Sequence, residues 1–116
     1  VTGFGLLGHA SHIARASGVT LRISASSVPV FAGASEAWAR GVRTGGADRN
    51  LEYVNPLVDW GRTTEAQRAL LVDPQTSGGL LVAVGPDRVA TYLSRVAGAV
   101  EVGTVTERTE FAIVLQ

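Results

Sequence analysis

The chain of 116 residues contains no cysteine, which excludes disulfide bonds, thiolate metal sites and a thiol nucleophile within it. Ten basic residues balance ten acidic ones, so the chain lacks the basic footprint that nucleic-acid binding normally needs. No apolar run approaches the roughly 18 residues that span a bilayer, and no basic segment followed by an apolar core opens the chain. We therefore expect a cytoplasmic protein that binds neither nucleic acid nor membrane.

The residues that are present indicate one folded domain. Hydrophobic residues make up 46% of the chain and charged residues only 17%, which argues against disorder. The length suits a single modest core, so we expect residues 1–116 to form one domain. Because the chain begins with Val1 rather than methionine, we expect it to be part of a longer protein.

The segment Leu70–Val84, LLVDPQTSGGLLVAV, places a polar loop between two apolar runs. Its second run, Leu80–Val84, has the length and composition of a strand buried on both faces. Pro74 favours an extended Asp73, and the two glycines that end the loop allow unusual backbone angles. A polar loop before a buried strand indicates a small-molecule site, although a plain connector with turn chemistry would read the same way.

The first residues, VTGFGLLGHA, lead into an apolar pattern with helical spacing. This pattern predicts a helix that ends near Gly18. Its buried face would contain Leu6, Leu7, Ala10, Ile13 and Ala14. The GxGxxG spacing is not a dinucleotide fingerprint, because no strand precedes it and no acidic residue follows about 20 positions on. Glycines that enter a helix can nevertheless bring backbone close to an anion.

Two pairs of polar residues leave alternatives open. His9 and His12 lie three apart on the first helix and could share a metal, but without a nearby third ligand a structural or solvent-facing role is favoured. Arg49 and Asn50 follow a glycine corner at Gly45 and Gly46. This second pair could bind phosphate or a neighbouring domain, or it could cap a helix or hold a loop in place.

The remaining segments predict further helices and strands. Alternation over 19–25 predicts a strand with Val19, Leu21 and Ile23 inward. Residues 33–40 predict a short helix with Ser35 as its N-cap, and the T-x-x-Q pattern from Thr64 predicts a capping box. Gly85 and Pro86 begin another helix, and residues 99–105 and 111–115 read as strands that close the fold, separated by a turn over 106–110.

Further residues are expected to pack in the interior. The predicted anchors are Trp38, Leu51, Tyr53, Val54, Trp60, Val89, Leu93 and Val96. Strands interleaved with helices predict an α/β (α+β) fold, with a mixed sheet covered by helices.

Three segments, VTGFGLLGH, GG-x-x-RN-L and DPQTSGG, occur in an order that resembles the C-terminal domain of selenophosphate synthetase (selenide, water dikinase). The resemblance implies a fold like the C-terminal domain of aminoimidazole ribonucleotide synthetase. It also implies an ATP-dependent enzyme that converts selenide to selenophosphate, AMP and phosphate. ATP and Mg²⁺ would be bound mainly by an N-terminal domain that this chain lacks, and the full enzyme would be a homodimer. The acidic magnesium ligand of the family would immediately precede Val1.

The resemblance implies a site that faces the cleft between this domain and its own N-terminal domain. Its phosphate- or substrate-facing residues would be Thr2, Gly3, Gly5, Arg49, Asn50, Asp73, Gln75, Thr76, Ser77, Gly78 and Gly79. No catalytic or metal-binding residue is assigned, and the isolated chain is expected to be inactive. The alternatives are another enzyme of the same superfamily, like aminoimidazole ribonucleotide synthetase or thiamine-monophosphate kinase, and a non-catalytic binding or dimerisation domain.

Overall fold

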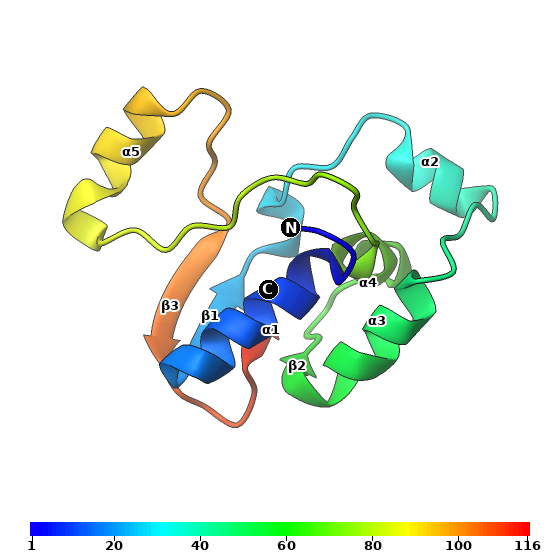
Figure 1. The fold of residues 1–116 in the computed structure, drawn as a ribbon, viewed down its shortest axis with the longest axis horizontal. Coiled ribbons are helices and arrows are strands. Elements are labelled where there is room, and N and C mark those ends of the chain that lie inside the picture. Colours follow the sequence, from blue (N-terminus) through cyan, green and yellow to red (C-terminus); the bar gives the residue numbers. More distant parts are fainter.

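The computed structural model describes all residues 1–116 and contains five α-helices and four strands (Figure 1). The helices are α1 (Gly5–Ser17), α2 (Ala34–Ala39), α3 (Ala47–Val54), α4 (Glu65–Val72) and α5 (Val89–Arg95). The strands are β1 (Val19–Ile23), β2 (Val58–Asp59), β3 (Gly103–Glu107) and β4 (Ile113–Leu115). Three short 3₁₀ turns, η1 (Ala25–Ser27), η2 (Asn55–Leu57) and η3 (Pro86–Arg88), join them. None of the helices combines the length and the apolar character that crossing a membrane requires.

The strands form one mixed sheet in the order β2-β4-β1-β3. Strand β1 is antiparallel to β3 and parallel to β4, and β2 is parallel to β4. Leu21 in β1 stands opposite both Val105 and Ile113, so apolar side chains line up across one face. The mixed sheet predicted from the interleaved pattern is confirmed.

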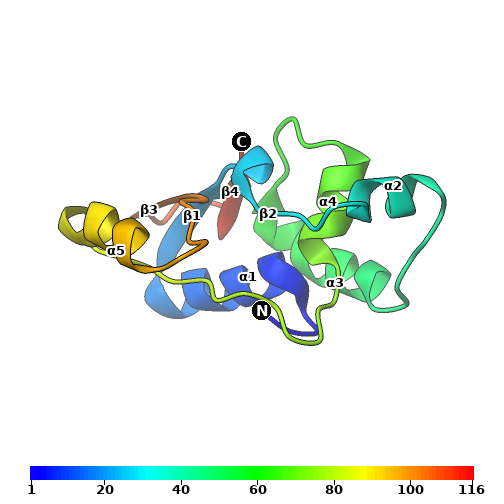
Figure 2. The same cartoon turned by 90° about the horizontal axis from the view of Figure 1, so that it is seen from above.

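Helix α1 packs against that face, where it contacts β1 and β4 (Figure 2). Its side chains Leu7, Ala10 and Ala14 are fully buried, as the spacing predicts. The helix ends at Gly18, which has a left-handed backbone. The prediction is wrong for Ile13, which remains 39% exposed because it lies at the margin of the buried stripe.

The alternation in β1 is wrong at Thr20, which is fully buried rather than solvent-facing. Its hydroxyl donates to the carbonyl oxygen of Phe111 at 2.7 Å and lies 3.0 Å from Oγ1 of Thr109. The turn between β3 and β4 therefore folds over this side of β1, and its polar groups satisfy the buried hydroxyl.

Helices α3 and α4 pack against each other and against α1. The capping box of α4 is confirmed, because the Thr64 side chain and Gln67 each satisfy the other's backbone N–H. Residues 47–54, which are not among the predicted helices, form helix α3, and Val54 on it is buried. Tyr53 is 42% exposed, so its predicted role as an anchor is wrong. Helix α2 begins after Gly33 and has no side-chain cap, so Ser35 is not its N-cap.

Leu80–Val84, predicted to be a buried strand, has no regular secondary structure. Leu80 is 90% exposed and Val82 is 45% exposed, while Leu81 packs partly against the core. No strand of the sheet pairs with this segment. Its backbone N–H and C=O groups therefore have no neighbouring strand with which to form the hydrogen bonds of a sheet. The prediction is wrong because composition does not reveal whether a partner edge exists.

Pro86 begins the 3₁₀ turn η3 rather than the α-helix, and α5 follows from Val89, later than predicted. The predicted buried stripe of this helix is also wrong. Leu93 and Val96 are 38% and 40% exposed, because α5 lies at the opposite end of the molecule from α2 and packs mainly against its own η3 turn (Figures 1 and 2).

The two closing strands exist, but β3 is displaced toward the predicted turn: it begins at Gly103 and runs to Glu107. The two-residue strand β2 was not predicted.

Candidate functional site

Two of the three motif segments lie side by side through backbone hydrogen bonds. The Val1 amine donates to the carbonyl oxygen of Gly79 at 2.8 Å, and Gly78 N–H donates to the carbonyl oxygen of Val1 at 2.9 Å. One step further along, Gln75 N–H donates to the carbonyl oxygen of Thr2 at 3.1 Å. The VTG turn and the DPQTSGG loop, which lie more than 70 residues apart in the sequence, therefore form one surface.

Two glycines allow this close approach. Gly5 has φ +67, and a Cβ there would lie 2.6 Å from the backbone carbonyl of Val72 at the end of α4. A Cβ on Gly78 would lie 2.6 Å from the carbonyl oxygen of Val1. The prediction of unusual angles is wrong for Gly78 and Gly79, since neither has a positive φ. Gly78 is needed for space, and Gly79 faces open space.

Asn50 connects the third motif to the other two. Its side-chain Nδ2 donates to the carbonyl oxygens of Gly3 and Val72, at 2.9 Å in each case, and the residue is only 8% exposed. Both protons of the amide nitrogen are used in these bonds. Of the two predicted roles, the structure therefore assigns this nitrogen to holding the backbone together. Arg49 lies on the exposed side of α3 and forms no ion pair within the chain.

Asp73 is held by a residue that the sequence reasoning did not single out. Thr44 Oγ1 donates to Asp73 Oδ1 at 2.7 Å. Asp73 has the extended backbone that Pro74 was predicted to impose. Pro74 itself packs against Gly46, where a Cβ would lie 2.6 Å from Cγ of the proline. The only sequence signal for Thr44 is its place beside the glycine corner.

The tip of the loop presents free polar groups. Thr76 and Ser77 are exposed, and their hydroxyls make no hydrogen bond within the chain. Gly3 and Gly79 have open space where a side chain would stand. This edge could accept hydrogen bonds from a ligand or donate to one, and its backbone is open to close approach.

His9 holds the VTG turn from the helix side. Its Nε2 lies 3.1 Å from the backbone nitrogen of Thr2 and 2.9 Å from Thr2 Oγ1. Burial, the positive amino terminus and His12 together lower the pKa of His9. His12 uses its own Nε2 differently, 3.1 Å from the hydroxyl of Tyr53. The sequence placed both histidines on one helix but gave no signal of these two contacts.

No three His, Asp or Glu side chains gather in a way that could hold a metal ion. The rings of His9 and His12 lie 6.3 Å apart, edge to face, and each Nε2 faces a different partner. The chain therefore supplies polar and backbone groups, without a complete set of metal ligands.

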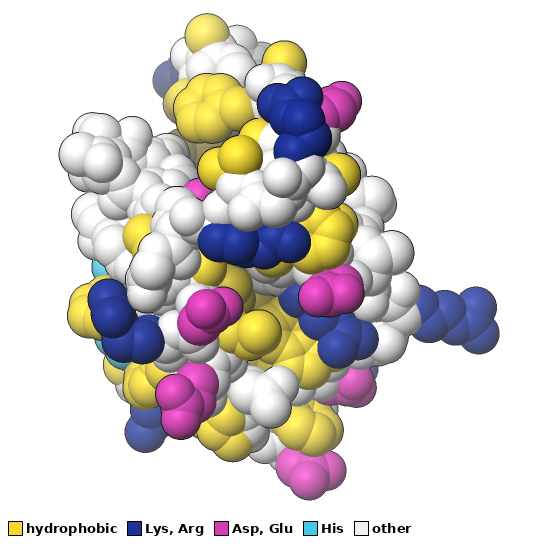
Figure 3. Space-filling view, turned by 90° about the vertical axis from the view of Figure 1, so that its right-hand side faces the viewer, with side chains coloured by type: hydrophobic (Ala, Val, Ile, Leu, Met, Phe, Trp, Pro, Cys, Tyr) yellow, Lys and Arg dark blue, Asp and Glu magenta, His cyan; other side chains and the backbone are white.

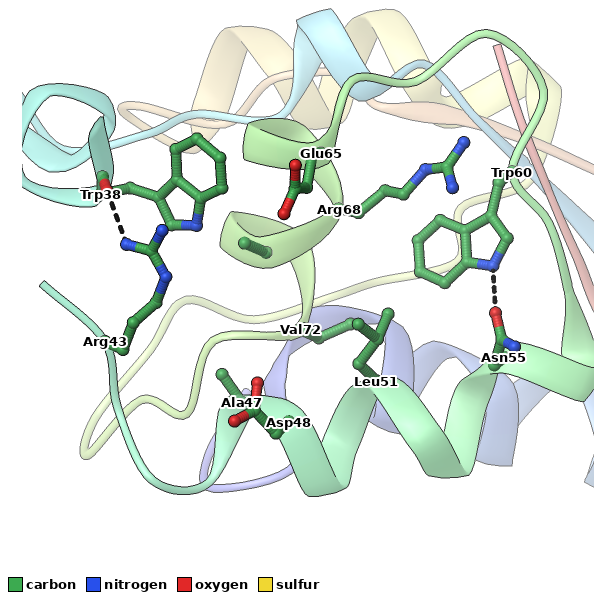
Figure 4. A pocket seen from close by; sticks show the side chains of 11 residues that line it. Trp38, Arg43, Ala47, Asp48, Leu51, Asn55, Trp60, Glu65, Arg68 and Val72 are labelled. Carbon is green, nitrogen blue, oxygen red and sulfur yellow. Dashed lines mark hydrogen bonds between the residues drawn. The ribbon is translucent and has the colours of Figure 1, made fainter. Parts of the chain in front are cut away.

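A separate hollow of about 230 Å³ lies between α3 and α4, with Trp38 at one end and Trp60 at the other (Figure 4). The guanidinium of Arg43 lies 4.4 Å from the Trp38 ring, and that of Arg68 lies 5.3 Å from the Trp60 ring. Figure 3 shows this side of the molecule, where basic and acidic side chains alternate around apolar ones. The hollow is smaller than the roughly 300–1,000 Å³ typical of ligand pockets, so the motif surface remains the stronger candidate. The sequence predicts a packing role for each tryptophan and gives no signal that the two lie at the ends of one hollow.

The chain belongs to the family described as AIR synthase related protein, C-terminal domain, which matches residues 1–116. Its helices and mixed sheet are compatible with that domain.

Several curated relatives carry the name selenide, water dikinase, which is the name of an enzyme. The protein from Geobacter metallireducens is 42% identical over 119 residues, covering 99% of this chain and 35% of that relative. The protein from Photobacterium profundum is 48% identical over 87 residues, covering 75% of this chain and 25% of the relative. The protein from Haemophilus influenzae is 39% identical over 120 residues, covering 100% of this chain and 34% of that relative. The chain therefore spans about a third or less of the length of these relatives.

Proposed function

We propose that this chain is the C-terminal domain of an ATP-dependent selenide phosphotransferase that makes selenophosphate, AMP and orthophosphate. The observation that carries the proposal is the junction at Asn50. This side chain joins the VTG turn to the end of α4, immediately before the DPQTSGG loop. The three segments that resemble selenophosphate synthetase are thus neighbours in space, and the relatives named selenide, water dikinase support the same activity.

The proposed contribution of this domain is to position substrate rather than to supply a nucleophile. Phosphoryl transfer depends on geometric clamping and on neutralising the charge that develops in the transition state. Asp73, Thr76 and Ser77 would give polar contacts at the cleft, and the backbone at Gly79 would allow a close approach. The exposed guanidinium of Arg49 suits a phosphate oxygen.

ATP and Mg²⁺ would be held mainly by an N-terminal domain. Within this chain no group of three His, Asp or Glu is placed to bind a metal, so the chain alone does not fit a resident Mg²⁺ site. When bound between the domains, the ion would neutralise phosphate charge. The groups that this chain would offer the nucleotide are the hydroxyls of Thr76 and Ser77 and the Arg49 side chain.

The proposed partner of this domain is the N-terminal domain of the same polypeptide, in a cytoplasmic homodimer. Exposed apolar side chains support an interdomain contact, since Phe31 and Leu80 are 89% and 90% exposed. The catalytic nucleophile would lie in the N-terminal domain, so the 116-residue chain alone should be inactive.

Phosphorus NMR of ATP with the full-length protein, under anaerobic conditions with and without selenide, tests the proposal. We expect a selenide-dependent signal from a phosphorus–selenium bond together with AMP. ATP that stays intact, or is consumed equally without selenide, would move the assignment to another substrate of the superfamily or to a binding role.

A further inference from the structure

The contact between His9 and Thr2 fixes the protonation state of the imidazole. A backbone N–H can only donate, so Nε2 of His9 must offer its lone pair to the Thr2 nitrogen 3.1 Å away. The hydroxyl of Thr2 lies 2.9 Å from the same nitrogen and can share that single lone pair only as a donor. This arrangement requires a neutral ring with its proton on Nδ1.

Thr2 transmits this contact to the polar loop. Its carbonyl oxygen accepts from Gln75 N–H at 3.1 Å and from Gly5 N–H at 3.0 Å. The peptide groups on both sides of Thr2 are therefore fixed, one by His9 and the other by the loop and the start of α1. If His9 were protonated at Nε2, its N–H would point at the Thr2 N–H, and the hydrogen bond would be lost.

We propose that His9 is a positioning residue, whose neutral, Nδ1-protonated ring holds Thr2 and, through Thr2, the DPQTSGG loop in its working geometry. The effect on turnover rests on the proposed function, whereas the tautomer does not.

The groups that face His9 determine its titration. His12 is on the same helix and is held by Tyr53 of α3, to which Arg15 also donates at 3.4 Å. The ring of Phe4 lies 5.7 Å from the His9 ring, edge to face. Asp73, on the neighbouring loop, is bonded to Thr44 instead. Burial and the positive charge of His12 lower the pKa of His9, as does the Val1 amine, which would be a neutral amide in a longer polypeptide.

The first experiment measures the tautomer directly. Nitrogen NMR of the full-length protein with isotope-labelled histidine, assigned with the His9→Gln variant, reports which ring nitrogen carries the proton. We expect His9 to be protonated on Nδ1 at neutral pH. A proton on Nε2 overturns the inference.

The second experiment measures turnover against pH. His9→Ala should lower kcat by about 10- to 100-fold with little change in KM, since misplacing a supporting group by an ångström can cost about that much. His9→Gln keeps an acceptor oxygen near the position of Nε2, so this variant should retain most of the wild-type kcat. Because glutamine does not titrate, the variant should also lose the fall of kcat at low pH that protonation of His9 causes. Equal losses in both variants, or wild-type kcat in His9→Ala, contradict a positioning role.

His12→Gln is the matched control, since His12 lies on the same helix but contacts Tyr53. It should keep the wild-type kcat at neutral pH. The fall of kcat on acidification should begin at a higher pH, because His12 no longer lowers the pKa of His9. If the wild-type protein shows no selenide-dependent turnover, the proposed function fails, and the NMR measurement still decides the inference on His9.

Discussion

Nδ2 of Asn50 lies 2.9 Å from the carbonyl oxygen of Gly3, a residue 47 positions earlier in the chain. The same nitrogen donates to the carbonyl oxygen of Val72, so one buried amide joins the first turn of the chain to α3 and α4. Because both acceptors are backbone groups, removing this side chain leaves them without a partner in a region with little access to water.

Asn50→Ala should therefore destabilise the 116-residue chain by about 2–3 kcal/mol, the cost of leaving buried acceptors unsatisfied. Urea unfolding measures this free energy. Arg49→Ala is the control from the next position, where the side chain is exposed and unpaired, and it should change stability by no more than about 0.5 kcal/mol. Equal effects of the two substitutions would show that the Asn50 junction does not hold the motifs together.

Gly5→Ala should cost about 2–4 kcal/mol, because a left-handed backbone and a collision with Val72 act together. Gly18→Ala separates the two causes: Gly18 has φ +65 but nothing near its missing side chain, so it should cost about 1–2 kcal/mol. Thermal unfolding of both variants measures the difference. A Gly5 variant no less stable than the Gly18 variant would mean that the turn does not approach α4 so closely.

Asp73→Ala should impair selenide-dependent AMP formation by the full-length protein more than it impairs folding. The carboxylate receives one hydrogen bond, from Thr44, at the surface, so its loss should lower stability by about 1 kcal/mol or less. Thr44→Val removes the same hydrogen bond and leaves the carboxylate in place. A melting temperature that falls equally in both variants, with activity falling only in proportion, would make this loop structural.

Stability should fall with decreasing pH in a window set by His9. The folded state lowers the pKa of His9, so below the ordinary value of about 6.5 the unfolded chain binds more protons than the folded one. The contribution of neutral His9 to the free energy of unfolding is complete above that pH. It is lost as the pH falls through the folded-state pKa of His9. Urea unfolding of the 116-residue chain between about pH 5 and pH 8 measures the slope. His9→Gln should flatten it, and an unchanged slope would show that His9 is not the group responsible.

The parts of the fold that sequence predicts are those with local causes. The spacing of Leu7, Ala10 and Ala14 on α1 and the capping box at Thr64 each depend on residues within a turn or two. The strand expected at Leu80–Val84 is absent because a strand needs a partner, and no residue near Leu80 tells whether an edge of the sheet is free. Helix α3 was missed because its polar side chains obscure a single buried side that carries Asn50 and Val54.

The candidate site shows the same division. The motif segments are visible in the sequence, and their resemblance to one family identifies which residues to inspect. The bonds from Asn50 to Gly3 and from Thr44 to Asp73 join positions 47 and 29 residues apart, and no local pattern encodes them. Gly78 was singled out for its backbone freedom, whereas the structure needs it for the space beside Val1.

The most direct test of the account is the product balance of the full-length protein with ATP and selenide under anaerobic conditions. We expect AMP, selenophosphate and orthophosphate to form in equal amounts, and we expect the omission of selenide to stop most AMP formation. Formation of ADP as the nucleotide product, or AMP formation that is indifferent to selenide, would contradict it.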